Sequence, residues 1–251
     1  MAERARLGQR ISLADIRSVS GFCVSLSLAV PPIMLWVRDL NAMAPLGNLA
    51  SSRLLTVDEI GTLLEVPEIL TAHNGSPILD QHCVVDDSVN LDAGETGGGA
   101  VRDGDTHLLD FALPTELVGT SSTRRELIVA LKILQKSGSL WTNQTVVFNF
   151  DSDNAVKNVL RFGSNKPDLN FLVKQIWELT EHFHINLKPR WVPREENAAA
   201  DTLSKIWSRT FTLLPQALTT ARTLGVKAPI VAPKFTLIGN TLTSLIPRGQ
   251  S

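Results

Sequence analysis

The sequence is poor in the residues that mark special structural classes. Its 251 residues include only two cysteines, Cys23 and Cys83. They lack CxxC spacing and a neighbouring histidine cluster, which excludes a disulfide framework or a zinc site of the usual kind. We therefore expect two buried thiols in a reducing compartment. Because the formal net charge is only −1, any basic surface for nucleic acid has to be local.

The chain also lacks a clean apolar run that would cross a membrane. Its most apolar stretch, residues 18–36, is interrupted by Pro31 and Pro32 and diluted by serines. A transmembrane helix needs about 20 consecutive apolar residues, so we predict a buried helical hairpin instead. No apolar core follows the first ten residues at signal-peptide distance. These features predict an intracellular protein of the cytoplasm or nucleus, neither secreted nor bound to a membrane.

The apolar pattern divides the chain into three parts. Residues 1–77 are predicted to be helical, and one helix opens at Thr56 before an acidic first turn. We interpret them as a connection segment. Residues 78–208 alternate strands and helices and are predicted to form one α/β domain. Residues 209–251 mix apolar patches with prolines and are expected to form a tail with one short helix.

The central part opens with an antiparallel meander. Its first strand ends at Asp92 and Ala93, and the glycines Gly97 to Gly99 predict a tight turn with positive φ before the return strand. A third strand follows from residue 107. The meander thus carries one carboxylate, Asp92, at the end of its first strand.

A helix and a central strand follow the meander. The helix begins near Thr123 and carries Glu126, and residues 145–150 form a nearly continuous apolar run suited to a strand buried on both faces. That strand ends at Asp151, and ligands of open α/β sheets bind at the carboxyl ends of strands. A further helix from Pro167 and a strand over residues 185–192 lead to a last helix, which contains Asp201.

Each of these four acids has an ordinary structural explanation. Glu126 would complete a capping box with Thr123, and Asp151 would cap the helix that follows it. Asp92 would be a turn residue, and Asp201 a solvated helix position. We favour a shared site because all four acids occur in order on compatible elements. Hard carboxylate oxygens without histidine or thiolate suit Mg²⁺, or Mn²⁺ in its place.

Four segments together resemble the ribonuclease H family. They are LDAGETGGGAV (91–101), SSTRRELIVAL (121–131), FDSDNAV (150–156) and WVPREENAAADTLSK (191–205). The combination is most similar to the ribonuclease H region of DIRS-type (tyrosine-recombinase) retrotransposon reverse transcriptase polyproteins. The resemblance implies a ribonuclease H-like α/β fold with a mixed five-stranded sheet, in which the first three strands form the meander and helices flank the sheet. In the family register Asp151, and not Asp153, is the third acid.

The resemblance also implies an activity and its site. The activity is metal-dependent endonucleolytic cleavage of the RNA strand of RNA/DNA hybrids, with Asp92, Glu126, Asp151 and Asp201 as catalytic and metal-binding residues. Two Mg²⁺ ions, about 4 Å apart, would bridge the scissile phosphate. Asp92 and Asp151 would contact both ions, Glu126 one and Asp201 the other. The expected substrate contacts are Gly97, Gly98, Gly99, Arg124, Arg125, Asn154, Arg194 and Asn197. A polymerase domain absent from this chain is the expected partner.

Two departures from the family pattern keep other interpretations open. Gly98 stands where the family usually has an aromatic residue, and the loop from Pro193 to Glu196 lacks the histidine that helps product release in cellular enzymes. One alternative is therefore an inactive retroelement relic that serves as a nucleic-acid-binding or packing domain. Another is a different enzyme of the same fold. The Glu-bearing helix between the first and third acids disfavours an integrase, and Asn197, four residues before Asp201, disfavours an exonuclease.

Overall fold

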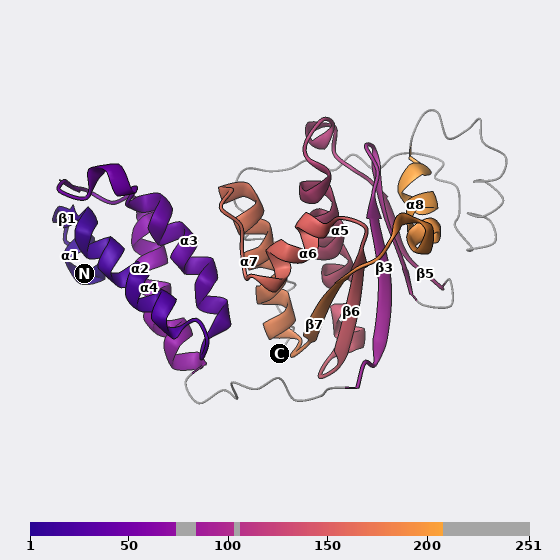
Figure 1. Cartoon of the computed structure of the whole chain (residues 1–251), viewed down its shortest axis with the longest axis horizontal. Coiled ribbons are helices and arrows are strands. Elements are labelled where there is room, and N and C mark those ends of the chain that lie inside the picture. Colours follow the sequence, from indigo (N-terminus) through magenta and orange to yellow (C-terminus); the bar gives the residue numbers. More distant parts are fainter. Residues whose placement is uncertain (74–83, 103–105, 208–251) are drawn as a thin grey trace, which may run out of the picture.

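The computed structural model describes residues 1–73, 84–102 and 106–207. In these ranges a group of N-terminal helices stands beside an α/β unit built on a five-stranded sheet (Figure 1). Cys83 and the expected tail helix lie outside the described residues.

The N-terminal part consists mainly of helices. They are α1 (Ala2–Arg6), α2 (Leu13–Leu26), α3 (Met34–Met43) and α4 (Val57–Ala72), with a small sheet of β1 (Ile11–Ser12) and β2 (Ser52–Arg53). Helices α2 and α3 pack against each other, which confirms the predicted hairpin. Cys23 lies buried in it, and burial raises the pKa of its thiol. In the described part of the chain, no helix combines the length and apolarity that a membrane crossing requires.

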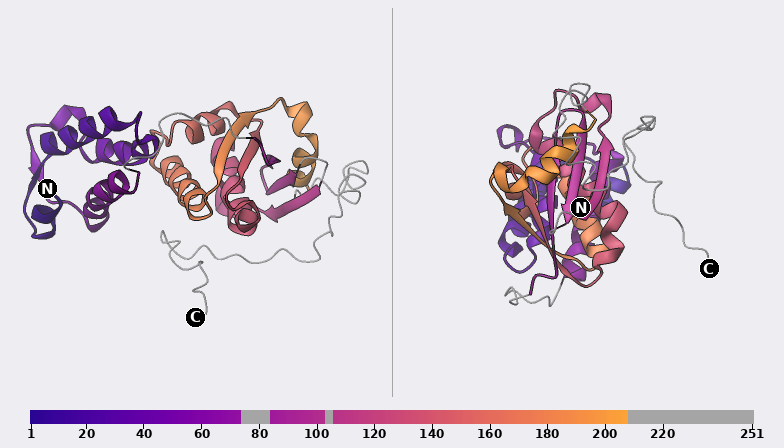
Figure 2. Two further views of the ribbon diagram at one scale, coloured as in Figure 1. Left: turned by 90° about the horizontal axis from the view of Figure 1, so that it is seen from below. Right: turned by 90° about the vertical axis from the view of Figure 1, so that its right-hand side faces the viewer.

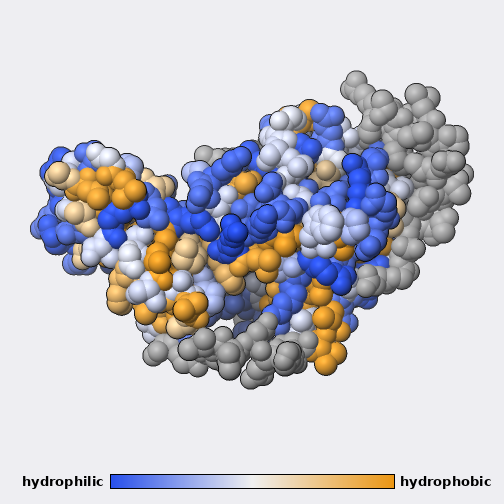
Figure 3. Space-filling view, viewed as in Figure 1, coloured by the Kyte–Doolittle hydropathy of each residue, from blue (hydrophilic) through white to orange (hydrophobic). Residues whose placement is uncertain are grey.

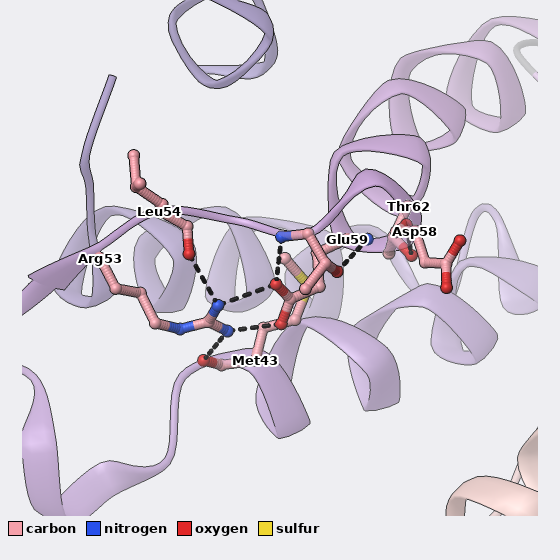
Figure 4. Close-up of polar contacts among 7 residues, drawn as sticks. Met43, Arg53, Leu54, Asp58, Glu59 and Thr62 are labelled. Carbon is pink, nitrogen blue, oxygen red and sulfur yellow. Dashed lines mark hydrogen bonds and ion pairs between the residues drawn. The ribbon is translucent and has the colours of Figure 1, made fainter. Parts of the chain in front are cut away.

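Arg53 ties the N-terminal elements together (Figure 4). Its guanidinium donates to the carbonyl oxygens of Met43, at the end of α3, and Leu54, and it forms an ion pair with Glu59 on α4. Glu59 also closes a capping box with Thr56, which starts α4 as the sequence predicted. The hydrogen bonds from Arg53 are the main cause that lowers the pKa of Glu59 to about 2.

The main sheet has the strand order β5-β4-β3-β6-β7. Its strands are β3 (Asp87–Ala93), β4 (Gly97–Arg102), β5 (Thr106–Ala112), β6 (Thr145–Phe150) and β7 (Asn186–Trp191). Strands β3, β4 and β5 pair antiparallel, whereas β6 and β7 add in parallel. This arrangement is the mixed sheet with an opening meander, and the α/β unit has the predicted ribonuclease H-like fold.

Helices cover both faces of the sheet (Figures 1 and 2). Helices α5 (Ser122–Ser137), α6 (Asp153–Leu160) and α7 (Pro167–His182) lie on one face, and α8 (Ala198–Lys205) lies on the other. The alternation of β3 separates the two layers, because successive side chains of a strand point to opposite faces. Val89 and Leu91 belong to the large core with α5. On the other side, Ala200 and Leu203 of α8 pack on Val101.

Gly97, Gly98 and Gly99 do not form the predicted turn. They are the start of strand β4, and none of them has positive φ. Glycine is needed there for another reason, which is space. A Cβ at Gly97 would lie 2.5 Å from the carbonyl oxygen of Ser204 in α8, and one at Gly98 would lie 2.9 Å from the ring of Phe111. Phe111 pairs with Gly98 across β4 and β5, so a neighbouring strand supplies the aromatic ring that the Gly98 position lacks.

The N-terminal helices pack on α7 through aromatic and charged side chains. The Trp36 and Trp177 rings meet edge to face at 5.5 Å, and Lys174 lies 4.5 Å above the Trp36 ring. Glu65 accepts a hydrogen bond from the Trp36 indole at 2.7 Å and pairs with Lys174. The predicted hairpin is only partly buried, because Phe22 and other large apolar side chains of this part are exposed. Figure 3 shows apolar surface on this end of the molecule.

We expect Gly98→Ala to destabilise the protein by about 1–3 kcal/mol, because the added methyl overpacks the space between Val129 and Phe111. Gly61→Ala, in α4, is the matched control. A Cβ there meets no atom within 4 Å, so alanine should stabilise the helix by up to about 1 kcal/mol. Urea unfolding followed by circular dichroism measures both changes. Equal stability of Gly98→Ala and the wild type would contradict the packing argument.

Candidate active site

Acidic side chains from four elements meet at one cleft of about 640 Å³. Asp92 comes from β3, Glu126 from α5 and Asp201 from α8, and Asp151 directly follows β6. Because β3 and β6 are parallel neighbours, their carboxyl ends bring Asp92 and Asp151 to the same edge of the sheet. The other residues that line the cleft are Ala93, Gly94, Glu95, Thr96, Ser122, Arg125, Ser152, Arg194, Ser204 and Lys205.

The ordinary explanations for these acids do not describe the structure. Ser121, not Thr123, caps α5 by accepting from the Arg124 amide, and Ser152 caps α6. Glu126 is therefore free of a capping role and is only 3% exposed. Asp92 lies within a strand and is 5% exposed.

Asp153, the competitor of Asp151, points elsewhere. It is exposed on α6 and forms an ion pair with Lys157 one turn later. It does not line the cleft, whereas Asp151 does. The position of the third acid thus agrees with the register of the family resemblance.

Burial and mutual repulsion raise the pKa values of the two innermost acids. Burial is the main cause that raises the pKa of Glu126 to about 8, and the charges of Asp151 and Asp92 add to it. Burial likewise raises the pKa of Asp92 to about 6 against an opposing hydrogen bond with the Ser204 side chain. Such clusters of carboxylates with strongly perturbed pKa values are typical of functional sites.

Asp201 has the opposite electrostatic environment. Its carboxylate Oδ1 accepts from Arg194 Nη2 at 2.7 Å, and Oδ2 pairs with Lys205. Partial burial acts to raise the pKa of Asp201. The hydrogen bonds and charges of Lys205 and Arg194 outweigh this effect, so the pKa of Asp201 lies below its ordinary value. The ordinary explanation, a solvated helix position, therefore does not describe Asp201, whose side chain is only 16% exposed and lies between two cations.

Asn197 is not placed to contact a substrate. It has no exposed surface, and its Nδ2 donates to the carbonyl oxygen of Leu91 at 2.7 Å. Leu91 directly precedes Asp92, so this amide joins the start of α8 to the strand that carries the first acid. The spacing of four residues before Asp201 predicted that Asn197 faces the site, but Asn197 does not line the cleft, and its hydrogen bond turns the side chain into the interior.

The other predicted substrate contacts divide into two groups. Arg125 and Arg194 line the cleft. Arg124 instead forms an ion pair with Asp168 at the start of α7, and Asn154 is exposed on α6 outside the cleft lining. The backbone of Gly97 to Gly99 is buried between α8 and the core, so it does not offer the open surface that a substrate contact needs.

Several cleft residues were missed at the sequence level. Glu95, Thr96, Ser122, Ser152, Ser204 and Lys205 all line it. The spacing of Lys205, one helical turn after Asp201, was a signal that indicates an ion pair. Ser204 had no comparable signal. It has no exposed surface, and its hydroxyl donates to the Asp201 carbonyl at 2.9 Å while its side chain also hydrogen-bonds Asp92.

Two observations bear on a metal ion. Among the residues that the structure describes, no three His, Cys, Asp or Glu side chains already converge as a finished ligand set; both oxygens of Asp201 are engaged by Arg194 and Lys205. Glu126 Oε2, however, is buried without a hydrogen-bond partner in the same part of the chain, a state that costs about 1–3 kcal/mol. A cation would relieve that cost, and the carboxylate donors fit Mg²⁺ or Mn²⁺.

A known protein family and several solved structures are similar to part of this chain. Residues 98–206 match the protein family described as "Reverse transcriptase-like". This range includes Glu126, Asp151 and Asp201 and begins after Asp92. No curated protein matches the chain.

Three solved structures are similar over 47% of this chain. The N-terminal RNase H domain of a Mycobacterium tuberculosis protein, fused to maltose-binding protein, is 25% identical, with 94% of that chain covered and a TM-score of 0.39. RNase H1 of the halophilic archaeon Halobacterium salinarum is 20% identical (92% covered, TM-score 0.38). An RNase H1 isolated from compost by a metagenomic approach, in complex with an RNA/DNA hybrid, is 20% identical (91% covered, TM-score 0.38).

We expect the metal-free protein to lose stability as the pH rises through the range set by Glu126. Its pKa rises from 4.5 to about 8 on folding, so the folded state binds the proton more tightly. Stability from this group is complete below pH 4.5 and is lost as the pH rises through about 8. Glu126→Gln cannot ionise, so it should be more stable than wild type near pH 8.5, by at most about 5 kcal/mol. Near pH 5 the two proteins should be nearly equal.

Urea unfolding in the presence of EDTA at both pH values measures this difference. Asp153→Asn is the matched control, because the Asp153 carboxylate is exposed and pairs with Lys157 outside the cleft. This variant should show the same dependence of stability on pH as the wild type. A Glu126→Gln protein with the wild-type pH profile would show that burial does not perturb this carboxyl group.

Proposed function

We propose that this protein is a ribonuclease H, a metal-dependent endonuclease that cleaves the RNA strand of RNA/DNA hybrids. The observation that carries the proposal is the meeting of Asp92, Glu126, Asp151 and Asp201 at one cleft. The orphaned Glu126 Oε2 and the family match over residues 98–206 support it. Asp92, Glu126, Asp151 and Asp201 are the proposed catalytic and metal-binding residues.

The proposed roles of the side chains follow from their environments. Asp92, Glu126 and Asp151 would hold the divalent cations, and Asp201 would complete the set after release from its ion pairs. Bound Mg²⁺ would supply positive charge that polarises the scissile phosphate and favours ionisation of the attacking water. Arg125 lines the cleft beside Glu126 and would bind a phosphate of the substrate backbone. The products would carry 5′-phosphate and 3′-hydroxyl ends.

The strand that is cut has to be identified by its 2′-hydroxyl groups, because these distinguish RNA from DNA. Exposed polar groups at the cleft rim include Glu95 and Ser122. They are better placed for such contacts than the buried Gly98 and Asn197. We therefore propose Glu95 and Ser122, in place of the glycines, as the contacts to the sugar hydroxyl groups.

We further propose that the domain belongs to a retroelement reverse transcriptase polyprotein, with the N-terminal helices as its connection segment and a polymerase domain as partner. The family match over residues 98–206 supports this context. The four sequence segments that resemble DIRS-type elements point in the same direction.

We expect wild-type protein with Mg²⁺ to cleave a labelled RNA/DNA hybrid and to leave double-stranded RNA and double-stranded DNA intact. Asp151→Asn and Asp201→Asn should each lose at least about 100-fold in cleavage rate, because each removes a negative charge from the cleft. Asp153→Asn is the matched control, two residues from Asp151 but outside the cleft, and should retain full activity. Equal cleavage by the wild type and both cleft variants would disprove the assignment.

A Mn²⁺ titration distinguishes the enzyme from an inactive relic that keeps the fold. Isothermal titration calorimetry should detect Mn²⁺ binding that Glu126→Gln weakens. A protein that binds hybrid but neither binds Mn²⁺ nor cleaves would instead be a relic with a binding role.

A further inference from the structure

The chain itself neutralises the acidic cleft unevenly. At one end both carboxylate oxygens of Asp201 are engaged, Oδ1 by Arg194 and Oδ2 by Lys205. At the other end Glu126 Oε2 is buried and has no partner among the described residues. Asp92 is buried near Asp151 and hydrogen-bonds the Ser204 side chain, and the charge of Arg194 also acts on it. Two direct ion pairs therefore hold Asp201, whereas the charge of Arg125 acts on Glu126 without engaging its buried Oε2.

We propose that Lys205 and Arg194 are resident counter-ions of this cleft, which hold Asp201 while no metal is bound and have to leave before a divalent cation binds there. The inference rests on the proposed function and deepens it. It implies that the two cation positions differ in affinity. The position around Glu126, Asp92 and Asp151 fills first, and the position at Asp201 fills second and more weakly.

The local structure builds both counter-ions into the site. Lys205 follows Asp201 by one turn of α8, so the pair forms whenever the helix forms. Arg194 comes from the 3-10 turn Arg194–Asn197 that precedes α8 and binds through both Nε and Nη2. Both side chains line the cleft, yet they are 65% and 45% exposed. Each can therefore move into solvent when a cation of like charge arrives.

The simpler explanation is that Asp201 and Lys205 form an ordinary helix-stabilising pair. The chain offers a direct comparison, because Asp153 and Lys157 form the same i,i+4 pair on α6. That pair is exposed and lies outside the cleft. The two lysines therefore share residue type, spacing and partner and differ in their distance from the acidic cleft. Only Lys205 should influence metal binding.

The test is a Mn²⁺ titration by isothermal titration calorimetry on wild type, Lys205→Gln and Lys157→Gln, each as the full chain. Removal of the Lys205 charge should tighten the weaker Mn²⁺ site by about tenfold, because the incoming cation no longer displaces an ammonium group. Lys157→Gln should bind Mn²⁺ as wild type does. Arg194→Gln changes a residue outside α8 and leaves the sequence of that helix intact. It should also tighten the weaker Mn²⁺ site, as Lys205→Gln does.

A double-mutant cycle with Asp201→Asn shows whether the effect passes through Asp201. In the Asp201→Asn background, Lys205→Gln should no longer change Mn²⁺ affinity. An undiminished gain in that background would overturn the inference, as would unchanged or weaker binding in both Lys205→Gln and Arg194→Gln. Those results leave the proposed function intact, provided wild type binds Mn²⁺. Failure of the wild type and all variants to bind Mn²⁺ would remove the proposed function and this inference together.

Discussion

The acidic cleft depends on the close contact between helix α8 and strand β4. A Cβ on Gly97 or Gly99 would lie closer than 3.0 Å to atoms of Ser204 and Leu203, a separation that real side chains do not show. Gly99 pairs with Asp92 across the sheet, and Asp201 lies on the same helix as Ser204. A larger residue at Gly97 or Gly99 would push α8 away from β4 and separate Asp201 from Asp92. Glycine weakens a strand by about 0.5–1 kcal/mol, and here that cost allows two acids from distant segments to share one site.

Two buried polar groups then set the orientation of α8 on the sheet. The Asn197 amide donates to the Leu91 carbonyl beside Asp92, and the Ser204 side chain hydrogen-bonds Asp92 on β3. An unpaired buried polar group is costly, so each bond favours one register of the helix on the strand. Acids on strands and helices are also held more rigidly than acids on loops. Packing thus brings the acids together, and burial first, with the charges of neighbouring carboxylates adding to it, raises the pKa values of Asp92 and Glu126.

Several elements of the α/β unit could be predicted because local signals are strong there. The apolar run over residues 145–150 coincides with β6. Helix α7 begins at Pro167 as predicted, because the fixed φ of proline suits the first position of a helix. The structural role of the glycines at 97–99 could not be predicted from the local sequence. Glycine favours turns locally, but these positions need glycine because helix α8, about one hundred residues later in the chain, packs closely against them. Asn197 illustrates the same limit. Its spacing from Asp201 predicts proximity, but only the packed structure shows that its amide points inward.

The N-terminal helices pack on the α/β unit away from the acidic cleft. They contact α7 through Trp36 and Glu65, and α7 covers the face of the sheet opposite α8 (Figure 1). None of the residues that line the cleft comes from these helices. The cleft lies at the carboxyl ends of β3 and β6, so the packing of the N-terminal helices on α7 and the meeting of the acids depend on different elements. Phe22 and the other apolar side chains that these helices expose are likewise not among the residues that line the cleft.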